Sequence, residues 1–184
     1  MQFFFGFITA VVVTIVALFT VVWAGLFNIA ATQHSTTLER LLAFAAARSI
    51  ARHAAVKTNP LPAEPQVLEV GLQQYADMCL MCHGAPGVEP HAFARNLSPK
   101  PPAMTATAVQ SSTDGELFWI ISHGIMATGM PAFGPGHSDE DIWQLVTFIR
   151  HMSHLSPAEQ QRLLAARQGD HHTGHAQEQA GHGH

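Results

Sequence analysis

The longest apolar stretch lies at the start of the chain. From Phe3 to Ala31 no side chain carries a full charge, and Phe, Val, Ile, Leu and Ala dominate. At about 1.5 Å per residue, a helix over this stretch exceeds the roughly 30 Å thickness of the hydrocarbon core of a bilayer. We therefore expect residues 1–31 to form a transmembrane anchor.

A cleaved signal peptide is the alternative interpretation of this stretch. Such a peptide has a basic start, an apolar part of about 7–15 residues and a cleavage site of the A-x-A kind. Here no Lys or Arg precedes Arg40, the apolar part is longer, and Asn28-Ile29-Ala30 is a poor cleavage site. These features favour an uncleaved anchor.

The next segment, 32–58, has a helical period. Arg40, Arg48 and Arg52 are separated by multiples of four, so they share one stripe of a helix, and leucines lie towards the other side. We expect an amphipathic helical spacer that lies on a membrane surface, contacts a partner subunit or is simply solvated. Residues 59–65 contain three prolines and predict a semi-rigid linker.

Residues 66–156 predict a small all-α domain. A helical pattern runs from Val67 to about Asp77, and residues 84–102 are rich in Gly and Pro, as in a long loop. Capping boxes at Thr113 and Ser138 predict two further helices, and no segment alternates convincingly as a strand. In the last segment, 157–184, Ser156 and Glu159 predict a short helix to about Arg167.

The chemistry of the chain is concentrated in Cys79-Leu80-Met81-Cys82-His83. Two thiols three positions apart, followed at once by histidine, are the spacing of covalent haem attachment. Cys79 and Cys82 would add to the two vinyl groups of the porphyrin, and His83 would bind the iron. The chain has two cysteines in all, so both are used.

Two other interpretations of a CxxC pair fit this sequence less well. A structural zinc site needs about four N or S ligands, yet the other dense histidines lie in the C-terminal tail. A thioredoxin-like pair belongs to a βαβ unit, whereas the flanks of this pair have helical patterns. The sequence also has no Gly-rich phosphate-binding loop, no nucleophile elbow and no basic stripe for nucleic acid.

The pattern resembles the small mono-haem class I cytochromes c, and more narrowly the membrane-anchored ones related to the cytochrome c subunits of terminal oxidases. The resemblance covers about half of the chain and rests on residues 79–84, 124–133 and 139–145. It implies an all-α fold with an N-terminal transmembrane helix, in which the first and last helices of the class I domain cross with Gly71 and Tyr75 near Trp143.

The resemblance also implies that Met130 supplies the sulfur ligand opposite His83. Gly129 permits a close approach of the backbone, and Pro131 fixes φ in the turn. Met126 and Met104 are the other sulfur candidates, and His123 would give bis-histidine ligation. Phe118, Trp119, Ile120 and Phe133 are expected to line the haem pocket.

A proline carbonyl often accepts the imidazole N–H of the haem histidine in this family, and such a bond sets the orientation and basicity of the ring. Here several prolines lie in the candidate region, and the sequence selects none of them: Pro86, Pro99, Pro101 and Pro102.

An iron held by His83 and Met130 has no open site, so the expected function is one-electron transfer rather than enzymatic catalysis. The expected role is a tethered carrier between a quinol-oxidising complex or dehydrogenase and a terminal oxidase or reductase. Two alternatives stay open: a five-coordinate haem for gas sensing or peroxide reduction, and a fixed cytochrome subunit of a larger oxidoreductase. Acidic residues outnumber basic ones in 66–156, so we expect an apolar contact patch around the haem edge.

Two signals conflict over membrane orientation. The positive-inside rule would keep the basic residues after the span in the cytoplasm: Arg40, Arg48, Arg52 and Lys57. In the families that the motif resembles, however, haem is ligated outside the cytoplasmic membrane. We therefore expect a single-pass protein of the bacterial cytoplasmic membrane with its haem domain in the periplasm.

The end of the chain, from Gly169, is rich in histidine and should be disordered. Such tracts suit Cu, Ni or Zn, although a solvated tail with incidental metal affinity explains the composition equally well. The candidate ligands are His171, His172, His175, His182 and His184.

Overall fold

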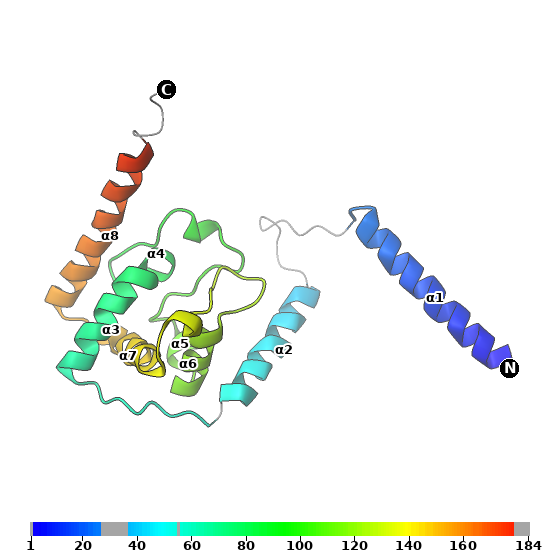
Figure 1. Cartoon of the computed structure of the whole chain (residues 1–184), viewed down its shortest axis with the longest axis horizontal. Helices are drawn as coiled ribbons and strands as arrows, with labels where there is room; N and C mark the ends of the chain where they lie inside the picture. The colour runs from blue at the N-terminus through cyan, green and yellow to red at the C-terminus, as the bar shows by residue number, and fades with distance from the viewer. Residues whose placement is uncertain (1, 27–36, 55, 179–184) are drawn as a thin grey trace. The chain divides into compact units, whose positions relative to one another are not determined.

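A computed structural model gives the structure of the chain and describes residues 2–26, 37–54 and 56–178 (Figure 1). They belong to two compact units, Met1–Ser35 and Thr36–His184. Within the described residues all secondary structure is helical, apart from an isolated bridge between Ala85 and Val88. This confirms the all-α prediction.

The first unit contains one long apolar helix, α1 (Gln2–Trp23). Its apolar side chains are exposed all around the helix. The stretch Phe3–Trp23 is long and apolar enough to cross a membrane, and the same length and composition also suit a signal sequence. The apolar N-terminal helix of the prediction is thus present.

The second unit contains seven α-helices and three short 3-10 helices among its described residues. They are, in chain order, α2 (Thr37–Ala54), α3 (Pro65–Met78), α4 (Leu80–His83), η1 (Ala94–Asn96), α5 (Thr107–Gln110), α6 (Asp114–His123), η2 (Gly134–Gly136), α7 (Asp139–His151), η3 (Met152–His154) and α8 (Pro157–Glu178).

Reciprocal capping boxes open the helices where the sequence predicts them. At α6, Glu116 N–H donates to Thr113 Oγ1 (3.2 Å) and Thr113 N–H donates to the Glu116 carboxylate (2.6 Å). Ser138 and Asp141 make the same pair of bonds at α7, and Ser156 and Glu159 at α8. Each box satisfies N–H groups that have no partner inside the helix.

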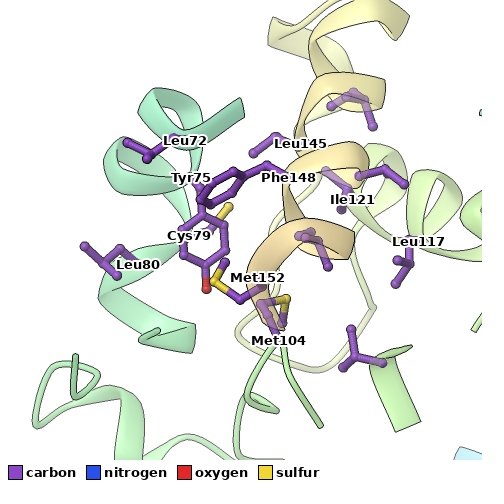
Figure 2. Close-up of a cluster of buried hydrophobic side chains, with 14 of the residues drawn as sticks. Leu72, Tyr75, Cys79, Leu80, Met104, Leu117, Ile121, Leu145, Phe148 and Met152 are labelled. Carbon is purple, nitrogen blue, oxygen red and sulfur yellow. The ribbon is translucent and has the colours of Figure 1, made fainter. Parts of the chain in front are cut away.

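Helices α3 and α7 cross at Gly71. A Cβ atom on Gly71 would lie 2.5 Å from the Gln144 carbonyl oxygen and 2.7 Å from Phe148 Cβ, so the crossing needs glycine. Tyr75 and Phe148 complete the contact with ring centroids 5.6 Å apart (Figure 2). The crossing is as expected, but its partners are Gln144 and Phe148. Trp143 instead packs on α6, because neighbouring residues on a helix point about 100° apart.

Helix α2 packs on α6. At this contact a Cβ on Gly115 would lie 2.5 Å from the carbonyl oxygens of Ala54 and Lys57. His53 stacks on Trp119 with ring centroids 6.0 Å apart, and Ala54 is buried. The helix expected as a spacer therefore contacts the domain that follows it.

Helix α8 packs along α3 and is longer than predicted (Figure 1). Leu163 is fully buried, and the Arg162 guanidinium makes two bonds to the Glu69 carboxylate, at 2.5 and 2.7 Å. The expected helix end near Arg167 is corrected to Glu178. The added part contains no proline, and the backbone bonds of a helix are local, so the helix can continue through the polar tail.

Candidate functional site

A cavity of about 300 Å³ brings together the four principal site residues of the prediction. Cys79, Cys82, His83 and Met130 all line it. The remaining lining is mostly apolar and comes mainly from α5, α6, the loops on either side of α5 and the loop after α6; it includes Leu97, Pro101, Pro102, Ile120, Ile121 and Phe133.

The two cysteines and the histidine lie on one helical turn. Cys82 N–H and His83 N–H both donate to the Cys79 carbonyl oxygen, at 3.1 and 2.9 Å. Both thiols are free. Burial raises the pKa of Cys79 to about 12 and also raises the pKa of Cys82. They are therefore protonated at neutral pH, unlike the low-pKa thiols of disulfide oxidoreductases.

The His83 ring is held by a backbone carbonyl. Its Nδ1 lies 2.8 Å from the Pro102 carbonyl oxygen. A carbonyl can only accept, so Nδ1 carries the proton and Nε2 keeps the lone pair that could bind a metal. Burial lowers the pKa of His83 and the bond to Pro102 opposes this, with a net decrease that favours the neutral ring. Among the prolines left open by the sequence, the structure selects Pro102.

The end of the haem-attachment motif is fixed by Tyr75. Its hydroxyl is buried and donates to the carbonyl oxygen of Gly84, the residue after His83, at 2.5 Å. The ring of the same tyrosine packs on Phe148 in α7 (Figure 2). Tyr75 thus links the end of the haem-attachment motif to the hydrophobic core of the domain.

Met130 lies in a compact loop that follows α6. Ile125 N–H donates to the Met130 carbonyl oxygen (3.2 Å), and Met130 N–H donates to Thr128 Oγ1 (3.1 Å). Gly124 starts the loop at φ +66°, where a Cβ would lie 2.7 Å from the Met130 oxygen. These contacts fix the backbone of Met130, which lines the cavity.

The other ligand candidates are placed differently. Met126 is 95% exposed and does not line the cavity. His123 stacks on Trp119, its Nδ1 lies 3.0 Å from the Trp119 carbonyl, and it is absent from the lining too. Met104 does line the cavity, but it also belongs to the buried hydrophobic cluster of the domain (Figure 2).

Half of the predicted pocket residues face the cavity. Ile120 and Phe133 line it, whereas Phe118 and Trp119 do not. Phe118 stacks on Trp143 with centroids 4.3 Å apart, and Trp119 packs on α2. This corrects the prediction, because three consecutive residues of a helix cannot all point to one side.

Several contributors to the lining, Leu97 and Lys100 among them, were missed in the sequence. Leu97 lines the cavity and approaches Gly129 so closely that a Cβ there would lie 2.9 Å from Leu97 Cδ1. Lys100 brings a charged side chain to the same lining. Both come from the loop after η1, whose composition gives no periodic signal for the direction of a side chain.

For the candidate metal ligands of the tail, the structure describes backbone positions at most. The backbone of His171, His172 and His175 belongs to α8, and His182 and His184 lie outside the described residues. Across residues 2–26, 37–54 and 56–178, no group of three or more His, Cys, Asp or Glu side chains is placed to hold a metal ion.

The residues around the cavity suit a covalent haem. Two thiols on one turn can bond the vinyl groups, a fixed imidazole offers Nε2, and the walls are mostly apolar. Together these features define a cytochrome c domain. Residues 66–149 match the family described as Cytochrome C oxidase, cbb3-type, subunit III, and this domain belongs to that family. No curated protein matches the chain.

Membership in this family carries three general consequences. A cytochrome c domain implies a covalently bound haem c. Such domains are extracytoplasmic and typically carry electrons. The relation to an oxidase subunit suggests an oxidase as partner.

Proposed function

We propose that the chain carries single electrons through one haem c that Cys79 and Cys82 bind covalently and that His83 and Met130 ligate. The observation that supports this proposal is the convergence of all four side chains on one cavity. When bound, the haem supplies a reversible one-electron change at iron. The protein holds the imidazole through Pro102 and presents the thioether of Met130, whose ligation raises the reduction potential.

The proposed route of the electrons runs from a quinol-oxidising complex or dehydrogenase to a terminal oxidase or reductase. The family of residues 66–149 supports an oxidase as acceptor. We propose that α1 stays uncleaved as a single-pass anchor in the bacterial cytoplasmic membrane, with the haem domain in the periplasm. The length and apolar composition of Phe3–Trp23 support the anchor.

The redox partner would contact an apolar patch at the edge of the cavity, formed by Ile125 and Met126. Ile125 lines the cavity and is 36% exposed, and its neighbour Met126 is 95% exposed. Such a patch allows brief contact without the many charge pairs that slow dissociation. Electron-transfer rates with an acidic partner should then fall little with added salt.

The test of this function is spectroscopic. A pyridine haemochrome spectrum of the purified protein should show one haem c, and the oxidised protein should show a far-red sulfur-to-iron band. A high-spin spectrum with prompt carbon monoxide binding would instead support the five-coordinate alternative. Co-purification with an oxidase after mild detergent extraction would distinguish a fixed subunit from a mobile carrier.

The histidine-rich end carries a separate proposal, binding of Cu, Ni or Zn by His171, His172, His175, His182 and His184. It is supported by composition. Deletion of the residues after Gly169 should abolish binding of these metals while the haem spectrum stays unchanged. Equal metal binding by the shortened chain would contradict it.

A further inference from the structure

The segment that carries Pro102 is tied to α7 by one side chain, Gln110. Gln110 Nε2 donates to the carbonyl oxygen of Met104 at 2.6 Å and to that of Ile149 at 3.0 Å. Both N–H bonds of the amide are therefore used, and they join two segments that lie far apart in the sequence. Met104 is two residues from Pro102, whose carbonyl oxygen accepts the hydrogen bond from His83 Nδ1.

Gln110 is itself held in place. Its backbone N–H donates to the Ala106 carbonyl (3.0 Å), so it ends the short helix α5 close to the Met104 turn. Arg150 donates to the Gln110 carbonyl (2.9 Å) and also bonds the Ser112 carbonyl. Asp114 fixes the same guanidinium at 2.7 Å. The position of Gln110 is thus determined by α7 from two sides, through Ile149 and through Arg150.

We propose that Gln110 is a positioning residue for the proximal imidazole: it holds the Met104 peptide so that the Pro102 carbonyl stays within bonding distance of His83 Nδ1. The inference rests on the proposed function, because it assumes that His83 ligates the haem iron. A strong bond from Nδ1 makes the imidazole a better electron donor and favours the oxidised iron. Gln110 therefore lowers the reduction potential although it does not itself line the cavity; it acts through the backbone of Met104 and Ile149, which do.

The test compares Gln110→Leu with wild type in the full-length holoprotein. Leucine removes both donors while filling similar space, so the 102–104 segment can move and the bond to His83 lengthens. We expect a higher reduction potential in a redox titration. We also expect faster solvent exchange of the His83 Nδ1 proton by NMR, with the far-red sulfur band retained. Gln110→Met should raise the potential and speed the Nδ1 exchange in the same way. It replaces Gln110→Leu if the leucine variant does not yield folded protein.

Two controls separate positioning from general destabilisation. Gln73→Leu makes the same change in α3, at an exposed glutamine whose amide bonds Asp77. Leu163→Ala weakens the core under α8, outside the cavity lining. Neither should move the potential or the Nδ1 exchange.

The outcomes are distinguishable. If both Gln110 variants lose stability but keep the wild-type potential and Nδ1 exchange, Gln110 has only a structural role and the inference is wrong. The inference is equally wrong if Leu163→Ala shifts the potential as much as Gln110→Leu does. Failure of the proposed function would appear earlier, as a wild-type protein without haem or without the His/Met spectrum.

Discussion

At the residue scale, the proposed ligation by Met130 would determine which chemistry the haem can perform. Met130 lines the cavity from a loop that begins at Gly124 and is closed by a hydrogen bond from Ile125 N–H to the Met130 carbonyl oxygen. A sulfur ligand fills the sixth position of the iron and stabilises the reduced state. A missing sulfur would open that position to small ligands.

Substitution of Met130 tests this assignment directly. Met130→Leu keeps the volume but removes the sulfur, so the far-red band should disappear and carbon monoxide should bind without denaturant. The reduction potential should fall by a substantial part of the roughly 0.8 V range that axial ligands cover. The measurements are optical spectra and a redox titration.

Met126→Leu is the matched control, since Met126 is 95% exposed and absent from the cavity lining. It should leave the band and the potential unchanged. If Met130→Leu kept the sulfur band while Met104→Leu lost it, Met104 would be the ligand.

The motif residues could be predicted from the sequence because their chemistry depends on local spacing. Cys79, Cys82 and His83 lie on one helical turn, so five consecutive residues determine the relative positions of the three side chains. Pro102 could not be selected, since the choice among several prolines depends on how the loop folds against the His83 ring. Gln110 gave no signal for the same reason: its partners, Met104 and Ile149, are carbonyls brought together only by the tertiary structure.

At the element scale, the helix starts are the most predictable part of the fold. The Asp141 carboxylate accepts bonds from the Ser138 hydroxyl and backbone N–H, and these bonds lower its pKa. A carboxylate with a lowered pKa in the folded state stabilises the protein above its unfolded pKa, roughly 3.9 for Asp. This stability is lost as the pH falls through the lower, folded-state pKa.

The pH dependence of unfolding should show this contribution. Asp141→Asn should lower the free energy of unfolding by about 1 kcal/mol at pH 7, as expected for a lost cap. Between about pH 5 and pH 3 the variant should lose less stability than wild type, because residue 141 no longer titrates. Denaturant unfolding followed by circular dichroism at each pH measures both effects.

Glu140→Gln serves as the control for Asp141→Asn. It changes the same charge one position earlier in the first turn of α7, and no capping bond of this helix involves it. Its acid sensitivity should stay close to that of wild type. Parallel pH profiles for Asp141→Asn and wild type would rule out the capping contribution.

The crossing of α3 and α7 depends on a small residue at Gly71. Gly71→Ala would place a methyl group 2.5 Å from the Gln144 carbonyl oxygen, which is backbone and cannot rotate away. We expect a destabilisation of about 1–3 kcal/mol, the usual cost of overpacking a core, measured as a lower denaturant midpoint.

Gly169→Ala is the corresponding control, because a Cβ there meets nothing within 4 Å. In a helix this change should be neutral or stabilising by up to about 1 kcal/mol. If Gly71→Ala were equally harmless, the two helices would not be in close contact at this point.

The packing of whole helices was less predictable than their starts. The periodicity of residues 37–57 indicates a helix but does not say which surface covers it, and the structure places it against α6 through Ala54 and Gly115. Likewise, nothing local in α8 indicates that Gln160 donates to the carbonyl oxygen of Pro86 (2.8 Å), in the loop that follows the haem-attachment motif. Periodicity reports which side of a helix is buried, while the partner depends on distant residues.

At the scale of the whole molecule, the chain joins a long apolar helix to an electron-carrying domain. As the proposed uncleaved tether, this helix would act on the kinetics of electron transfer, because it would confine the carrier to the plane of the membrane in which its proposed partners lie. Confinement raises the effective concentration for a second contact by factors that reach 10²–10⁴ when the geometry permits. The haem site itself should not depend on it, since every residue that lines the cavity lies within Thr36–His184.

Replacing residues 1–26 by a cleavable signal peptide tests the anchor. The released protein should keep its haem spectrum and reduction potential, while electron transfer to the oxidase in membranes should fall on the order of 10²-fold at equal amounts of protein. An unrelated apolar helix of the same length in place of residues 1–26 should restore the rate, because the tether needs span length and not this sequence. Mass spectrometry of the mature wild-type protein completes the test. Loss of the N-terminal segment from that protein, or an undiminished rate for the released form, would show that α1 serves as an export signal instead.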